Sequence, residues 1–156
     1  MPDYSDYNAR KNGKYKDIWT STGKCVFCDL KDKYIIRREK EAVLTVNIFP
    51  YIDGHMLVIP TRHVEDFLEI DKHEWAVMRD LAEVGIKLLR KELHLEEVWI
   101  LIRAPGGLKA QKTVAHSHML LLPHKKELVS WNYQEITISP IELAERFRKA
   151  LENGFN

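Results

Sequence analysis

The sequence has few cysteines, no long apolar run and no dominant charge, and each absence narrows the possibilities. Two cysteines among 156 residues are too few for a disulfide framework. No apolar run is long enough to span a bilayer, and residues 1–4 do not resemble a signal peptide, so we expect a cytoplasmic protein. The formal net charge of +1 provides no overall field that would favour nucleic acid or a membrane surface. Any bound anion must therefore be held by a local site.

Length and composition indicate one folded domain. The 156 residues fit a single domain, and 45% hydrophobic with 30% charged residues is an ordinary balance for a folded protein. Residues 1–22 are rich in polar side chains, which favours an arm that lies on the surface or is disordered. We therefore expect the domain over residues 23–156, without an internal repeat or a low-complexity tract.

Apolar runs and turn residues predict the strands of a sheet. Three short runs, at residues 34–37, 42–47 and 55–60, follow one another so closely that the strands should pair antiparallel. Two more strands are expected at 98–102 and 114–122.

Two helices are predicted beside these strands, which gives an α+β fold. Asp71 is a suitable N-cap with Glu74 three residues on, and apolar residues then recur at helical spacing as far as Leu89. One face of this helix should pack on the sheet. A second amphipathic helix is expected to begin at Pro140.

Cys25 and Cys28 are separated by two residues in the chain. This spacing suits a redox pair or half of a metal site, and two ordinary buried cysteines are the remaining alternative. A thioredoxin-like pair should follow a strand and open a helix, and no such βαβ pattern surrounds these cysteines. We favour half of a zinc site, because two thiolates at this spacing can share one tetrahedral ion.

Two of the seven histidines, His116 and His118, lie in one predicted strand. Alternation places both on the same face of the sheet. Two imidazoles in an apolar strand are costly to desolvate without polar partners. A pair of half-buried, hydrogen-bonded histidines would explain them, but we favour a functional site.

Three motifs resemble the histidine triad (HIT) superfamily, and they stand along the chain in the order that the family has. Residues 116–123 (HSHMLLLP) resemble its His-φ-His-φ-His-φ-φ signature, where φ is apolar, which is often followed by Pro. Residues 47–60 (NIFPYIDGHMLVIP) are similar to its Asn-x-x-Pro-x-x-x-Gly-His-x-φ-φ-φ-Pro stretch. Residues 25–28 (CVFC) resemble the Cys-x-φ-Cys of its zinc-containing branches. The resemblance covers roughly residues 24–152.

The resemblance implies a fold and a reaction. The implied HIT-like fold has a five-stranded antiparallel sheet, two main helices and an N-terminal zinc-bound segment, in a homodimer. Family members cleave or transfer a nucleoside monophosphate from phosphate esters, anhydrides or phosphoramidates. This sequence looks closest to the branch that acts on dinucleoside polyphosphates as hydrolase or phosphorylase. Adenine nucleotides are the implied partners and Zn²⁺ the implied structural ion, and Mg²⁺ accompanying the substrate is compatible with the sequence.

His118 matches the nucleophile of the family. An imidazole has an ordinary pKa of about 6.5, so its neutral form is a nucleophile near neutral pH. Attack on the α-phosphorus would form a covalent nucleotidyl-histidine and divide one difficult displacement into two easier ones. The other ring nitrogen must then donate a hydrogen bond, commonly to a backbone carbonyl.

The resemblance also implies contacts with the nucleotide. Asn47 matches an asparagine that contacts the sugar, and Arg103 falls near a polar residue at the end of the fourth strand. Gln111, Lys112 and Thr113 precede the histidines, in the segment that closes over the phosphate in the family. Phosphoryl oxygens need such donors.

The implied zinc ligands are the two cysteines, His63 after the third strand, and His116 as the first triad histidine. Two sulfurs and two nitrogens give a closed tetrahedral site, which is structural rather than catalytic. For His63 the alternative is a surface histidine in a turn. We expect His55 to pack or hydrogen-bond rather than to act chemically.

Leu120 occupies the third triad position, where family members have His or Gln, both of which can donate a hydrogen bond. One lost oxyanion donor costs ~100–1000-fold in rate. Three explanations stay open: a donor from elsewhere, such as Lys109, Lys112 or His124; a slow enzyme; or a module that binds nucleotides without turning them over. A purely structural zinc domain is a further alternative.

Overall fold

The computed structural model describes residues 3–104, 114–125 and 133–154. It divides into two compact units, Met1–Lys125 and Lys126–Asn156, which are described separately. The first unit contains, in chain order, α1 (Ser5–Lys11), α2 (Tyr15–Ser21), a 3-10 turn (Asp32–Tyr34), β1 (Ile35–Arg38), β2 (Ala42–Val46), β3 (Met56–Pro60), a second 3-10 turn (Phe67–Glu69), α3 (Lys72–Leu93), β4 (Val98–Ile102) and β5 (Met119–Pro123). The second unit contains α4 (Pro140–Asn153).

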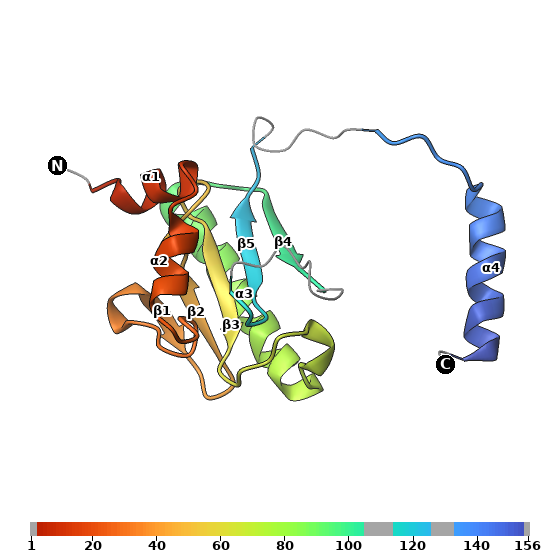
Figure 1. Ribbon diagram of the computed structural model, residues 1–156, viewed down its shortest axis with the longest axis horizontal. Coiled ribbons are helices and arrows are strands. Elements are labelled where there is room, and N and C mark those ends of the chain that lie inside the picture. The colour runs from red at the N-terminus through yellow and green to blue at the C-terminus, as the bar shows by residue number, and fades with distance from the viewer. Residues whose placement is uncertain (1–2, 105–113, 126–132, 155–156) are drawn as a thin grey trace. The chain divides into compact units, whose positions relative to one another are not determined.

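Five antiparallel strands form one sheet in the order β1-β2-β3-β5-β4 (Figure 1). Leu57 of β3 lies opposite Leu120 of β5, and Val58 lies opposite Met119. Because side chains alternate along a strand, Leu57 and Leu120 share one face, and Val58 and Met119 share the other. The predicted α+β fold with its five-stranded antiparallel sheet is confirmed.

The long helix α3 covers one face of the sheet. The Asp71 side chain accepts hydrogen bonds from the backbone of His73 and Glu74, and the Glu74 side chain accepts one from the Asp71 backbone, which confirms the predicted capping box. The helix approaches β5 so closely that a Cβ on Gly85 would stand 2.5 Å from Leu121 Cδ1. Alternate strand residues and one side of α3 form the main buried core: Ala42, Leu44, Met56, Val58, Met78, Leu81, Ala82, Leu89, Met119 and Leu121.

The opposite face of the sheet carries a smaller apolar cluster. Leu57, Ile59 and Leu120 form this cluster, and Phe27 and Leu30 pack against it. Figure 1 shows α2 on the side of the sheet away from α3. The N-terminal part of the chain therefore covers the face that α3 leaves open.

The N-terminal segment, for which we expected a surface arm or a disordered stretch, forms the two short helices α1 and α2, and most of its residues are exposed. Tertiary contacts compensate for its polar composition: Arg10 Nε–H donates to the Phe49 carbonyl oxygen at 2.6 Å, and the rings of Tyr15 and Phe49 lie 6.0 Å apart. A domain boundary at residue 23 stays a prediction.

The fifth strand is shorter than predicted. It begins at Met119, so His116 and His118 lie just before it rather than within it. The neighbouring strand β3 ends in Pro60, which has no N–H to continue a ladder. The Ser117 N–H donates instead to the Val64 carbonyl oxygen beyond β3, at 2.6 Å.

The second unit contains the predicted amphipathic helix. The Ser139 side chain accepts the Glu142 N–H at the start of α4, and Pro140 occupies the first turn. Its apolar residues Ile141, Phe147 and Leu151 are exposed within this unit. Across the described ranges, no helix has the length and apolar character needed to cross a membrane.

Candidate metal centre and nucleotide pocket

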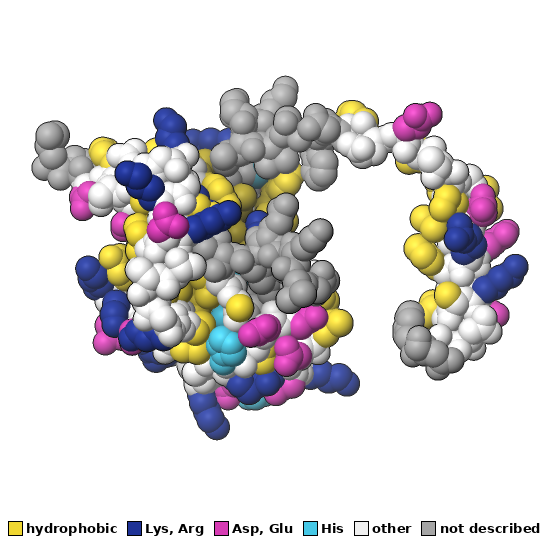
Figure 2. All heavy atoms as spheres, in the orientation of Figure 1, with side chains coloured by type: hydrophobic (Ala, Val, Ile, Leu, Met, Phe, Trp, Pro, Cys, Tyr) yellow, Lys and Arg dark blue, Asp and Glu magenta, His cyan; other side chains and the backbone are white. Residues whose placement is uncertain are grey.

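Four side chains that are distant in sequence meet beside the end of β3. The ligand atoms of Cys25, Cys28, His63 and His116 all lie within 4.8 Å of one another. The cysteines follow α2, His63 follows β3, and His116 precedes β5. Figure 2 shows a histidine surface bordered by apolar and acidic side chains on this face of the molecule. The structure thus brings together the complete predicted metal set.

The spacing of these atoms fits a tetrahedral ion. His116 Nδ1 lies 3.4 Å from Cys25 Sγ and 3.6 Å from Cys28 Sγ, and His63 Nδ1 lies 3.3 Å from Cys28 Sγ. A tetrahedral ion with zinc-like bond lengths would separate its sulfur and nitrogen ligands by about 3.5 Å. His116 is fully buried, and its Nε2–H donates to the Pro60 carbonyl oxygen at 2.9 Å. That bond directs the Nδ1 lone pair of the neutral ring towards the two cysteines.

The cysteines favour a bound cation on electrostatic grounds. Desolvation first, and then the neighbouring Cys25 thiol, raise the pKa of Cys28. A divalent cation stabilises both thiolates and offsets their repulsion. Two soft sulfurs with two imidazoles are a donor set that selects transition metals over Mg²⁺ or Ca²⁺.

The backbone sets the tautomer of His118. Its Nδ1–H donates to the His116 carbonyl oxygen at 2.8 Å. Because a carbonyl only accepts, Nδ1 carries the proton and Nε2 carries the lone pair of the neutral ring. This is the hydrogen bond that a nucleophilic role requires. The ring is half-buried and lines a pocket of about 730 Å³.

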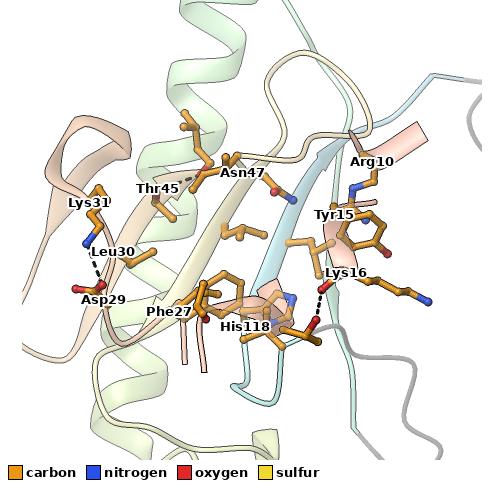
Figure 3. Close-up of a pocket in the computed structure, with 18 of the residues that line it drawn as sticks. Arg10, Tyr15, Lys16, Phe27, Asp29, Leu30, Lys31, Thr45, Asn47 and His118 are labelled. Carbon is orange, nitrogen blue, oxygen red and sulfur yellow. Dashed lines mark hydrogen bonds and ion pairs between the residues drawn. The ribbon is translucent and has the colours of Figure 1, made fainter. Parts of the chain in front are cut away.

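Phe27 connects the metal ligands with His118. Its ring lies edge-on to both histidines, with centroids 5.0 Å from His118 and 6.0 Å from His116. Figure 3 shows Phe27 beside His118 in the pocket. Since Phe27 stands between Cys25 and Cys28 in the chain, the residues that would hold the ion also place this ring against His118.

The pocket is strongly cationic, although the chain is nearly neutral. Asp29 is the single acidic residue among the described lining residues, and Lys24 and Lys31 both pair with it, at 2.5 and 2.9 Å. Their hydrogen bonds lower the pKa of Asp29 to about 2. The cationic lining residues are Arg10, Lys16, Lys24, Lys31 and Arg103.

A family comparison agrees with this geometry. The model of the HIT domain family matches residues 30–127. The chain belongs to the HIT domain family. The predicted resemblance is therefore confirmed.

Two curated HIT relatives are similar to this chain. An uncharacterized HIT-like protein of Mycoplasma genitalium is 27% identical over 138 residues, which cover 85% of this chain and 96% of the relative. Adenosine 5′-monophosphoramidase HINT3 of Danio rerio is 26% identical over 114 residues, which cover 69% of each chain.

Two solved HIT structures share the fold. A HIT family protein from Bacillus subtilis superposes with a TM-score of 0.70 at 20% identity, over 85% of this chain and 98% of that one. A zinc-bound histidine triad protein from Mycobacterium smegmatis gives a TM-score of 0.56 at 27% identity, over 67% of this chain and 78% of that one.

Two predicted nucleotide-binding residues of this HIT protein line the pocket, namely Asn47 and Arg103. The Asn47 side-chain oxygen accepts the Phe49 N–H at 3.0 Å, and its amide nitrogen lies 3.4 and 3.3 Å from the two ring nitrogens of His55. His55 is buried and accepts the Tyr51 N–H at Nδ1, as expected of a packing residue. Desolvation first, and then the charges of Arg10 and His118, lower the pKa of His55 to about 3.

At the third triad position, Leu120 contributes an apolar surface to the pocket. The structure does not support His124 as its replacement: that ring stacks on Trp99 at 4.3 Å and pairs with Glu97, at the far end of β5. Lys109, Gln111, Lys112 and Thr113 lie outside the described residues.

Sequence reasoning missed three lining or bracing residues. Arg10 and Tyr15 line the pocket from α1 and α2, and Phe27 lies against His118. Their contacts join segments far apart in the chain, and no periodicity in residues 1–30 could have revealed them.

Proposed function

We propose that this HIT protein is a nucleotidyl hydrolase or transferase that cleaves dinucleoside polyphosphates or nucleoside phosphoramidates through a covalent intermediate on His118. The hydrogen bond from His118 Nδ1 to the His116 carbonyl carries the proposal, because it puts the Nε2 lone pair in a cationic pocket. The relative named as an adenosine 5′-monophosphoramidase supports adenine nucleotides and a P–N bond as substrate features.

The proposed reaction has two displacements at one phosphorus atom. The lone pair of His118 Nε2 forms an N–P bond, and the bond from phosphorus to the leaving oxygen or nitrogen breaks with its electron pair and then takes a proton. Water or another acceptor next forms a P–O bond, gives up its proton, and returns the N–P electron pair to the imidazole. Arg103, one of the cationic lining residues, would stabilise negative charge on the attacked phosphoryl group during both steps.

The nucleotide contacts follow from the same placement. Asn47 would bind the sugar and Arg103 the phosphate, since both line the pocket with His118. Gln111, Lys112 and Thr113 would close over the phosphate.

We assign Zn²⁺ to the site of Cys25, Cys28, His63 and His116. Their sulfur and nitrogen spacing fits tetrahedral ligation, and the structure from M. smegmatis is zinc-bound. The four ligands leave no position for substrate, so the ion would supply structural cross-linking rather than Lewis-acid chemistry. It would hold Phe27 and the His116 carbonyl against His118. Mg²⁺ would bind with the substrate phosphates.

A homodimer is part of the proposal. The edge strand β4 exposes Ile100 and Leu101, at 51% and 41%, and a second copy would cover such side chains. Sedimentation equilibrium should give about twice the chain mass. A monomer at every concentration would contradict this part alone.

One observation favours a second function, a nucleotide-binding module without turnover. Leu120 packs with Leu57 and Ile59 at the position where a hydrogen-bond donor is expected, and a leucine side chain cannot assist the leaving group. Turnover then decides between the two functions. Nucleotide binding without product formation would support the module.

The enzymatic proposal is tested by trapping the intermediate. After mixing with a diadenosine polyphosphate and rapid acid-free quenching, intact mass spectrometry should detect a nucleotidyl adduct in the wild type. The adduct should be absent from His118→Ala and present in His73→Ala, whose imidazole is exposed and pairs with Glu41. Equal turnover in wild type and His118→Ala would exclude the proposed nucleophile.

The role of Leu120 at the third triad position has its own test. If the missing donor limits the rate, Leu120→Gln should raise turnover by up to ~100-fold, because one oxyanion donor has about that value. An unchanged or lower rate would show that another group already acts on the phosphoryl or leaving group.

A further inference from the structure

Part of the pocket lining comes from residues outside the segment that the HIT family model matches. The family model covers residues 30–127, whereas Arg10, Tyr15, Lys16 and Thr20 also line the pocket from α1 and α2. The N-terminal helices therefore add groups of this chain to the binding space.

Arg10 is the most firmly held of these groups. Its guanidinium carbon lies 4.3 Å from the centroid of the Tyr15 ring and 4.2 Å from that of Tyr51. Its Nε–H donates to the Phe49 carbonyl oxygen at 2.6 Å. Cation–π contact with two rings and a hydrogen bond leave the half-buried side chain little rotational freedom. Figure 3 shows Arg10 and Tyr15 together at one end of the pocket, away from Asp29 and Lys31.

Arg10 keeps hydrogen-bonding capacity for a ligand. A guanidinium has five N–H donors, and the Phe49 carbonyl accepts the one on Nε. No carboxylate among residues 3–104, 114–125 and 133–154 forms an ion pair with it. Lys24 and Lys31, by contrast, share Asp29. A preorganised guanidinium without a carboxylate partner matches an anion that accepts two parallel hydrogen bonds, such as phosphate.

The position of Arg10 relates it to the nucleotide. Tyr51 stacks on His55 with ring centroids 5.4 Å apart, and the Asn47 amide contacts the same imidazole. Arg10 thus lies on the Asn47 side of the pocket, and Figure 3 shows it apart from His118, the residue proposed to attack phosphorus. A pocket of about 730 Å³ has room for more than one phosphate group.

We propose that Arg10 binds a second phosphate group of the nucleotide, distinct from the one that His118 attacks, so that α1 and α2 select for substrates with two phosphates. This inference rests on the proposed nucleotide function. The second phosphate has two possible attachments: further along the phosphate chain, or on the sugar next to Asn47. Either presents anionic phosphoryl oxygens to the guanidinium.

Isothermal titration of the full-length, metal-loaded protein with three ligands tests the inference. Adenosine monophosphate carries one phosphate, adenosine diphosphate adds a second in the chain, and adenosine 3′,5′-bisphosphate adds a second on the sugar. In the wild type, one of the two larger ligands should bind about 10- to 100-fold more tightly than the monophosphate. The ligand that shows this gain identifies the attachment.

Arg10→Gln should abolish that gain and leave the affinity for the monophosphate within about twofold. Lys11→Gln is the matched control, because Lys11 is the adjacent exposed cation and does not line the pocket. It should retain the gain.

Four outcomes would overturn the inference. A wild type that gains nothing from either second phosphate excludes a second phosphate site. A gain that persists in Arg10→Gln assigns it to another residue, and an equal loss for all three ligands reduces Arg10 to a structural brace. A wild type that binds none of the ligands overturns the proposed function together with this inference. If the wild type binds the monophosphate normally, the failure concerns the role of Arg10 alone.

Discussion

The two faces of the sheet are held by different kinds of contact. On the face under α3, apolar side chains such as Leu44, Val58 and Leu121 are buried against one long helix. On the opposite face, the cover consists of α1, α2 and the cysteine turn, and it is attached by the Cys/His cluster and the hydrogen bond from Arg10. The α3 face therefore provides stability that does not depend on a ligand, while the pocket face, with its smaller apolar cluster, would depend on the ion proposed for the Cys/His site and on a few polar contacts.

The largest expected effect is a loss of turnover, which depends on the pocket face alone. His118→Ala should lower turnover by ~10⁴-fold or more, because removing a nucleophile eliminates the covalent route. The thermal midpoint should change little, since the ring is half-buried at the pocket wall. Steady-state kinetics and a thermal scan of the same preparation check both parts. A large loss of stability would show that His118 also supports the fold.

Metal removal should remove the stability that the pocket face contributes and leave that of the α3 face. Cys28→Ser, or chelation of the wild type, should cost about 4 kcal/mol, as expected for the loss of a structural metal. The thermal midpoint should fall by roughly 10 °C. Elemental analysis and calorimetry measure the two changes. A midpoint that is unaffected by chelation would contradict a structural ion at this site.

Leu120 and Leu121 are neighbours in the chain on opposite faces, which makes them a matched pair. Leu121→Ala should lower the free energy of unfolding by about 3 kcal/mol, because Leu121 is fully buried under α3. Leu120→Ala should lower it by about 2 kcal/mol, because the cavity left by the substitution would merge with the pocket. Urea unfolding measures both costs. Only Leu120→Ala should alter nucleotide affinity. An effect of Leu121→Ala on affinity would show that the faces are coupled.

The smallest effect is a pH dependence from His55. Its pKa is lowered to about 3 in the folded state, so between pH ~6.5 and 3 the unfolded chain binds a proton that the folded chain does not. Its contribution to stability is complete above the unfolded pKa and is lost as the pH falls, by at most ~1.4 kcal/mol per pH unit. His55→Gln should make stability less steep than in the wild type between pH 7 and 5, measured by urea unfolding at constant zinc. Equal slopes would contradict this role.

Prediction from the sequence succeeded where the determining contacts are local. The capping box of Asp71 and Glu74 and the short strand predicted from the apolar run at 42–47 follow from neighbouring residues, and the structure contains both. The length of β5 was not predictable in this way, because its first residue is set where Pro60 of another strand offers no N–H. The metal set followed from family spacing, and the structure brings its four members together.

The sequence by itself determined the order of the strands along the chain, the capping box of the long helix, the choice of the four candidate metal ligands and the family, because each is encoded in residues close together or in motifs of fixed spacing. Only the tertiary structure decided that Arg10 lies between two tyrosine rings in the pocket and that Phe27 lies against His118. It also decided that the His116 carbonyl sets the tautomer of His118. The reason is physical: the Arg10–Phe49 hydrogen bond spans 39 residues, and such contacts form only when the whole sheet positions both partners.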